Sequence, residues 1–199
     1  MSETEEKESV MSKKSRLTLQ IVGGAIFGAL SLVLAFLAAF LPRTPEGFAY
    51  FDPISIIWVI CYLIFGPLAG LISAVIGMLL LMPFDPFAPI GPIMKFTATV
   101  ALILPSYVLM KYIKKDVSSG TLKEPKTYAT YGVIGIIVRI AVMVPLNIVV
   151  YIALGYPTEF LGVYLILVVI FNILQSVWDL LIPYLVVYVT KIDEKFEIW

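Results

Sequence analysis

The chain has 199 residues, of which 60% are hydrophobic and 14% are charged, and its mean hydropathy is +0.98. A soluble domain of this length cannot hide so much apolar surface in one core, so the composition predicts a membrane protein surrounded by the lipid bilayer. The 14 basic and 14 acidic residues balance to a net charge of zero, which leaves no basic excess for a nucleic-acid partner.

Apolar segments of membrane-spanning length follow a charged N-terminal stretch. A spanning helix needs about 20 mostly apolar residues, because the hydrocarbon layer is roughly 30 Å thick and a helix rises about 1.5 Å per residue. Residues 1–16 are predicted to be a cytoplasmic tail, residues 17–190 a transmembrane domain, and residues 191–199 a second cytoplasmic tail. Within the domain the apolar runs are 17–41, 54–82, 93–113, 128–154 and 161–190.

The run 54–82 has two interpretations, because Gly66-Pro67 interrupts it. It forms either one tilted helix or two short helices. Basic residues concentrate in cytoplasmic loops, and only two short helices would place all the basic clusters on one side. These clusters are residues 13–16, 111–126 and 191–195. The sequence therefore predicts an all-α, polytopic membrane protein with six transmembrane helices and with both termini in the cytoplasm.

The loops expected to face outside, 42–53, 83–92 and 155–160, are rich in proline and aromatic residues. Prolines stiffen a segment and aromatic rings give it something to bury, which favours a structured lid. Tyr50 and Phe51, in the first of these loops, are candidates for contact with a ligand. The alternative is an interfacial belt, in which the rings lie among the lipid headgroups.

Three ionisable residues, Lys95, Arg139 and Asp179, lie inside the predicted spans. A charge in hydrocarbon costs about 2.5–3.5 kcal/mol or more, so each needs a partner, water or a ligand. Lys95 is expected in the first turn of its helix, where the helix dipole disfavours a cation. It is therefore a candidate ligand contact, with snorkelling to the interface as the alternative. Arg139 and Asp179 are predicted to pair across the bundle, in which case neither touches substrate.

Amide side chains form a second set of candidates. Asn172 and Gln175 stand seven and four residues before Asp179, so one face of the sixth helix carries all three. Asn147 lies in the outer half of the fifth helix. Because an amide facing lipid would be left unsatisfied, these side chains should point inward. They either join helices to one another or bind a polar ligand in an outward-facing pocket.

Small residues mark the first helix. Ala25 and Ala29 lie four residues apart, with Gly24 and Gly28 beside them. Small residues at this spacing let another helix approach closely, so this face is a candidate contact surface.

The sequence lacks the residues and motifs of the common catalytic machineries. One cysteine, Cys61, and no histidine exclude disulfide frameworks, Cys/His zinc sites and Ser-His or Cys-His catalysis. There is no phosphate-binding G-x-x-x-x-G-K-[ST] loop, no H-E-x-x-H and no G-x-S-x-G. A membrane-embedded enzyme would have to use Asp179, Lys95 or Arg139, and the shortage of acid–base pairs argues against it. The chain is therefore expected to bind a ligand rather than to catalyse, with an assembly factor as a further alternative.

In these residues and their order, the chain resembles the substrate-binding (S) components of energy-coupling factor (ECF) transporters, and among them the riboflavin-type members. The resemblance covers nearly the whole chain, from the first helix to the sixth. It rests on short motifs in a shared order: Phe65-Gly66-Pro67-Leu68-Ala69-Gly70, Pro89-Ile90-Gly91-Pro92, Lys95-Phe96-Thr97-Ala98 with Leu104-Pro105, Asn147, and Phe171-Asn172-Ile173-Leu174-Gln175.

The resemblance implies six helices in the plasma membrane, with an outward-facing pocket built by helices four to six and capped by the first outer loop. It also implies that Ala25 and Ala29 dock on a transmembrane coupling subunit, which works with two cytosolic ATPases. Substrate is then captured outside, and the binding subunit topples in the membrane to release it inside. No cofactor is expected, since riboflavin would be the transported ligand.

Some pocket positions depart from the riboflavin-type pattern. Such members usually carry a Lys-Asn pair where this chain has Gly77-Met78, an Asn where Lys95 stands and a Lys where Gln175 stands. A mispaired buried group costs about 1–3 kcal/mol, so these exchanges alter which ligand edges are satisfied. Riboflavin is the first candidate, and another vitamin or precursor is the alternative. The predicted substrate contacts are Lys95, Asn147, Asn172, Gln175, Tyr50 and Phe51.

Overall fold

The computed structural model describes residues 13–45, 47–196 and 199. Within this part of the chain the fold is all-helical and contains no strand, apart from an isolated bridge between Arg43 and Ala49. The predicted tail 1–16 lies mostly outside the described residues. The helices are α1 (Lys13–Ala38), α2 (Pro53–Phe65), α3 (Pro67–Leu81), α4 (Ile90–Leu109), α5 (Ser119–Lys123), α6 (Pro125–Ala153), α7 (Leu161–Tyr184) and α8 (Asp193–Phe196). Short η helices are η1 (Met110–Lys114), η2 (Thr158–Phe160) and η3 (Leu185–Val189).

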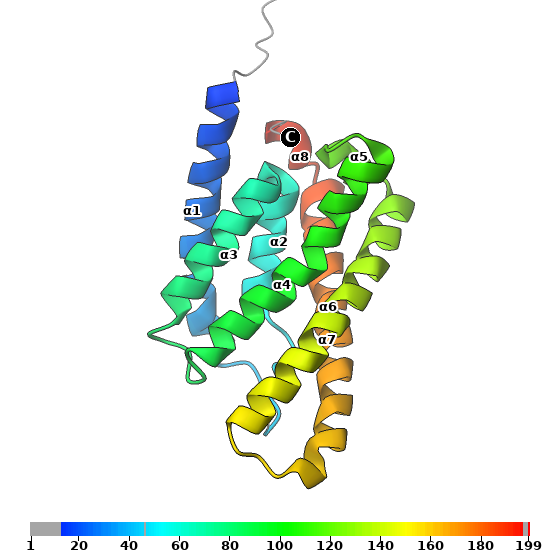
Figure 1. Cartoon of the computed structure of the whole chain (residues 1–199). Coiled ribbons are helices and arrows are strands. Elements are labelled where there is room, and N and C mark those ends of the chain that lie inside the picture. Colours follow the sequence, from blue (N-terminus) through cyan, green and yellow to red (C-terminus); the bar gives the residue numbers. More distant parts are fainter. Residues whose placement is uncertain (1–12, 46, 197–198) are drawn as a thin grey trace, which may run out of the picture.

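The break predicted at Gly66-Pro67 is present, and it separates α2 from α3. Gly66 has φ +98°, a conformation that favours glycine because it has no Cβ. Pro67 follows at the first position of α3, where its missing N–H costs nothing. The two helices fold back on each other (Figure 1), and a Cβ at Gly70 would lie 2.7 Å from the Tyr62 Cβ. The apolar run 54–82 is therefore a tight helical hairpin.

Among the described residues, four helical segments are long and apolar enough to cross a membrane, and the protein is membrane-embedded. They are Lys14–Ala38, Ile90–Lys114, Pro125–Ala153 and Thr158–Val189. The other two apolar helices, α2 and α3, have 13 and 15 residues. At about 1.5 Å per residue they extend roughly 20 and 22 Å, which is less than the hydrocarbon thickness. Of the six predicted spans, four thus meet the length requirement by themselves.

The short helix α2 occupies the centre of the bundle. All of its residues except Pro53 and Ile57 are buried, as expected for a helix that is hydrophobic on every side. It contacts α1, α3, α4 and α7, while α4 packs on α6 and α6 on α7. Because its neighbours enclose it, α2 forms the apolar core rather than a surface facing lipid.

The two ends of the bundle differ in character (Figure 1). The start of α1, the α2–α3 junction, α5 and α8 lie at one end, and the loops 39–52, 82–89 and 154–160 lie at the other. At the first end Lys123 pairs with Glu194 at 2.6 Å, and Trp199 Nε1 donates to the Leu63 carbonyl at 3.0 Å. The hydrogen bond between Lys123 and Glu194 raises the pKa of Lys123 and lowers that of Glu194. The three basic clusters, at residues 13–16, 111–126 and 191–195, all lie at this end of the bundle.

Close packing of α4 on α6 depends on Gly135, so we expect Gly135→Ala to destabilise the fold. A Cβ at this position would lie 2.3 Å from the Leu102 carbonyl oxygen, and backbone would have to move to admit it. Overpacking of this kind costs about 1–3 kcal/mol of unfolding free energy. The measurement is the melting temperature of the purified variant in detergent.

The matched control is Gly162→Ala, because a Cβ at Gly162 meets nothing within 4 Å. Its melting temperature should match that of the unmodified protein. Equal melting temperatures for the two variants would contradict the packing argument.

Candidate functional site

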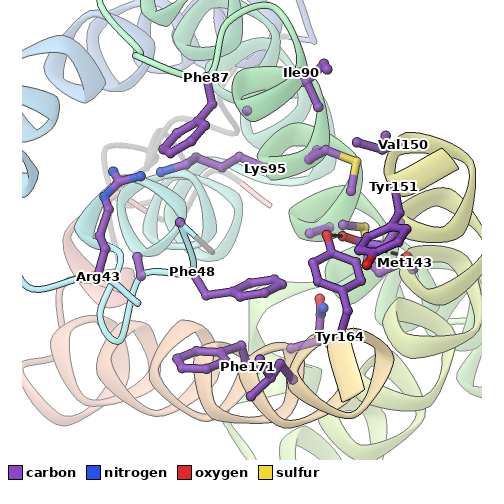
Figure 2. Close-up of a pocket in the computed structure, with 18 of the residues that line it drawn as sticks. Arg43, Phe48, Phe87, Ile90, Lys95, Met143, Val150, Tyr151, Tyr164 and Phe171 are labelled. Carbon is purple, nitrogen blue, oxygen red and sulfur yellow. Dashed lines mark hydrogen bonds between the residues drawn. The ribbon is translucent and has the colours of Figure 1, made fainter. Parts of the chain in front are cut away.

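A cavity of about 640 Å³ opens at the end of the bundle opposite α5 and α8. Its walls come from α4, α6 and α7 and from the loops 39–52 and 82–89 (Figure 2). Small-molecule sites commonly occupy roughly 300–1,000 Å³, so the cavity is large enough for a vitamin-sized ligand. Of the residues predicted to contact substrate, it brings together Lys95, Asn147, Asn172 and Gln175.

One wall of the cavity is aromatic (Figure 2). Phe48 stacks on Phe171 with ring centroids 5.2 Å apart and planes inclined by 10°. Tyr164 extends the wall, with its centroid 5.6 Å from that of Phe48 and 4.7 Å from that of Tyr151. Flat apolar rings of this kind bury the faces of an aromatic ligand.

Asn147 provides a polar point on this wall. It is buried, its Nδ2 donates to the Met143 carbonyl at 2.8 Å, and its Oδ1 accepts from the Tyr164 hydroxyl at 2.8 Å. An amide has two N–H groups and an oxygen with two lone pairs. One donor and one acceptor of Asn147 therefore remain for a ligand after these two hydrogen bonds.

The inner end of the cavity is closed by Arg139, which is 2% exposed. Its Nη1 donates to Asp179 Oδ2 at 2.7 Å, its Nε to Asn172 Oδ1 at 3.0 Å, and its Nη2 to Gln175 Oε1 at 3.0 Å. The predicted pairing of Arg139 with Asp179 is confirmed, as is the shared helix face of its three partners. Arg139 nevertheless lines the cavity, whereas Asp179 lies behind it. The pair is thus structural, and the Arg139 guanidinium also faces the cavity.

Lys95 forms a second ion pair, with Asp52. The Lys95 Nζ lies 2.6 Å from Asp52 Oδ2, and the two side chains are 15% and 8% exposed. The expectation that Lys95 stands in the first helical turn is wrong, because α4 begins at Ile90 and Lys95 lies in the second turn. The dipole of α4 therefore does not determine the role of Lys95. The ion pair with Asp52 holds the Lys95 side chain beside the cavity.

Sequence reasoning missed Asp52 and Ser55, which join the two ion pairs. Asp52 caps α2 by accepting from the Ile54 N–H at 3.1 Å, and an Asp directly before Pro53 is a local signal for such a cap. The Ser55 hydroxyl donates to Asp179 Oδ1 at 2.6 Å and also approaches the Asp52 carbonyl oxygen at 3.2 Å. Ser55 therefore lies between the two ion pairs at the base of the cavity, hydrogen-bonded to the Asp179 carboxylate and next to the Asp52 backbone.

The aromatic loop residues lie differently from the prediction. Tyr50 packs edge-on against Phe171, and Phe51 packs edge-on against Trp178, but neither belongs to the cavity lining. Phe48 lines the cavity instead, because a tight turn, in which the Phe48 N–H donates to the Thr44 hydroxyl at 3.1 Å, directs its ring inward. Tyr50 and Phe51 support Phe171 and Trp178 of α7.

The small residues of α1 face two directions. Gly24 and Gly28 are buried against α3, where added Cβ atoms would lie 2.8 Å from Ile72 and 2.7 Å from Ile76. Ala25 is half-buried and Ala29 is exposed. The glycines therefore serve packing within the chain, and the alanine face stays open on the outside of α1.

Among the described residues, no group of three or more acidic, cysteine or histidine side chains is placed to hold a metal ion. Comparison with known proteins found neither a matching family model nor a similar curated protein. The lining of the cavity combines flat aromatic rings, amides with spare hydrogen-bonding groups, and the ion-paired side chains of Lys95 and Arg139.

We expect Asp179→Asn to destabilise the protein strongly, because it leaves the Arg139 charge buried without a counter-charge. Breaking one partner of a buried pair costs about 3–5 kcal/mol. The measurement is thermal or denaturant unfolding of the purified protein in detergent.

Glu159→Gln is the matched control, since Glu159 is exposed in the loop before α7 and its neutralisation should leave stability unchanged. Replacing both partners, in Arg139→Met with Asp179→Leu, should recover part of the loss. If Asp179→Asn and Glu159→Gln have the same free energy of unfolding, the ion pair does not stabilise the bundle.

Proposed function

We propose that this protein is the substrate-binding (S) component of an ECF importer for a water-soluble vitamin in the plasma membrane, with riboflavin as the first candidate. In this proposal it captures its ligand outside the cell and has no catalytic activity. A transmembrane coupling subunit and two cytosolic ATPases supply the energy for release inside. The observation that carries the proposal is the assembly of Lys95, Asn147 and Asn172 around one cavity at the end opposite the basic clusters.

The charge distribution supports the orientation. The basic residues of the α4–α6 connection and of the tail flank α5 and α8, as does the start of α1. Since basic loops stay in the cytoplasm, we assign this end and both termini to the cytoplasm. The cavity then opens to the exterior. In this arrangement α2 and α3 are the second and third of six transmembrane helices, and their short lengths are accommodated because the surrounding longer helices enclose α2.

The outer face of α1 supports a partner within the membrane. Around Ala25 and Ala29 stand apolar side chains that are largely exposed, among them Ile26 at 59% and Val33 at 56%. Small residues between larger apolar ones let a second helix pack closely. The coupling subunit is the partner that the resemblance implies for this face. It would connect this chain to the two ATPases, which hydrolyse ATP.

The residues available to contact the ligand differ in part from those of a riboflavin-type member. Gly77, where such members carry a lysine, has no room for a side chain, because an added Cβ would lie 2.5 Å from Trp58 Nε1. The Trp58 indole instead donates to the Ser31 hydroxyl at 2.6 Å. Polar contacts therefore come from other residues of the lining, Lys95 and the amides among them, and another vitamin or precursor is the alternative to riboflavin.

Purification from a rich host provides the first test. The chain alone should retain a small molecule, identified by its mass and, for a flavin, by its visible absorbance. In vesicles, uptake should require the coupling subunit and the ATPases. Gradient-driven uptake by the chain alone would refute the proposal.

We expect Asn147→Ala to weaken ligand binding, because it removes the spare donor and acceptor on the aromatic wall. Loss of such hydrogen bonds costs about 1–3 kcal/mol, or roughly five- to 150-fold in Kd. Affinity is measured by titration of the purified chain, or from ligand-induced stabilisation, which reaches about 2.7 kcal/mol at 100 times Kd.

Val149→Ala controls for a change on the same helix, since Val149 is 63% exposed on its outer side. Its Kd should match that of the unmodified protein. Equal weakening by both variants would assign the effect to α6 as a whole and not to the Asn147 amide.

A further inference from the structure

The charges around the cavity are unequally compensated. Lys95 is paired with Asp52, and Arg139 with Asp179. Asp85 accepts from the Phe87 N–H at 2.8 Å beside the start of α4, where backbone donors favour a carboxylate. Arg43 also lines the cavity, but within residues 13–45, 47–196 and 199 no carboxylate lies within ion-pair distance of it.

Arg43 is positioned by the loop backbone. It forms a bridge with Ala49, and the Ala49 carbonyl accepts from Gln175 Nε2 at 2.8 Å. The turn between them is closed by the Thr44 N–H, which donates to the Phe48 carbonyl at 2.9 Å. The loop is thereby tied to α7, so the base of the Arg43 side chain has a fixed place beside the cavity.

The side chains of Arg43 and Lys95 point toward one another from facing sides of the cavity (Figure 2). Among the described residues of the lining, Arg43 is thus a cation without an ion pair that faces the Lys95–Asp52 pair. A guanidinium offers a planar pair of donors that fits carboxylate or phosphate, and an anion between two converging cations relieves their repulsion. An anion bound there would pair with Arg43 and contact Lys95.

We propose that the ligand carries an oxyanion, a carboxylate or a phosphate, that binds between Arg43 and Lys95 near the cavity mouth. Its ring then lies against Phe48 and Phe171 and meets the Asn147 amide. This inference rests on the proposed function and narrows its substrate class, because it favours anionic vitamins or phosphorylated precursors over uncharged ones. The inward direction of Arg43 favours a ligand in the cavity over a lipid headgroup outside it.

The test compares matched pairs that differ in one anionic group. Suitable pairs are riboflavin 5′-phosphate with riboflavin, pyridoxal phosphate with pyridoxal, pantothenate with panthenol, biotin with biotinamide, and nicotinate with nicotinamide. Titrations use the purified full chain in a detergent with an uncharged headgroup, where no lipid phosphate competes. For at least one pair we expect the anion to bind about tenfold tighter or more, since charge-assisted hydrogen bonds are the stronger kind.

Arg43→Gln should abolish most of this preference, because it weakens binding of the anion much more than binding of the neutral member. Arg16→Gln is the matched control, because Arg16 is exposed at the opposite end of the bundle. In the unmodified protein the preference should also shrink as salt is raised, since the mouth is open to solvent. Whether the phosphate or the carboxylate pairs show the preference identifies the anion.

Two failures are distinguishable. Equal affinities within every pair that binds, or a preference that survives Arg43→Gln, would overturn this inference and leave the proposed function standing. Failure of every compound to bind the unmodified protein would overturn the proposed function and the inference together.

Discussion

The Arg139 Nη1 and Asp179 Oδ2 atoms lie 2.7 Å apart inside the bundle, where the two residues are 2% and 1% exposed. A buried charge requires a counter-charge and hydrogen bonds for its remaining donors or acceptors. The need to satisfy this pair accounts for much of the polar arrangement around it. Asn172 and Gln175 accept from the guanidinium, and Ser55 donates to the carboxylate. The pair therefore fixes α2, α6 and α7 relative to one another at the depth where the cavity ends.

The same network determines where the outer loop lies. Gln175 uses its oxygen for Arg139 and its amide nitrogen for the Ala49 carbonyl. A side chain that stabilises a buried charge thus also holds the loop that carries Phe48 against Phe171. The buried ion pair and the position of the outer loop are coupled through this one amide, so the shape of the cavity follows from how the ion pair is satisfied.

Polar and apolar functions are divided between the two halves of the bundle. Helices α1, α2 and α3 pack through glycines and large apolar residues, and Gly24 and Gly28 bring α1 against α3. Helices α4, α6 and α7 bear the cavity and most of its polar groups. In the proposed importer the first half would contact the coupling subunit and the second would hold the vitamin, so that each surface is free for its own partner.

Composition, local backbone preferences and helical periodicity predict the membrane class, the helix break at Gly66-Pro67 and the common face of Asn172, Gln175 and Asp179, because each depends on neighbouring residues. The pairing of Arg139 with Asp179 is predicted on another ground, since a charge within a membrane span needs a partner. Tertiary structure decided that Asp52 pairs with Lys95 and that Phe48, rather than Tyr50 or Phe51, faces the cavity. Those contacts join the outer loop to helices far along the chain, and local patterns carry no information about how such a loop folds back onto them.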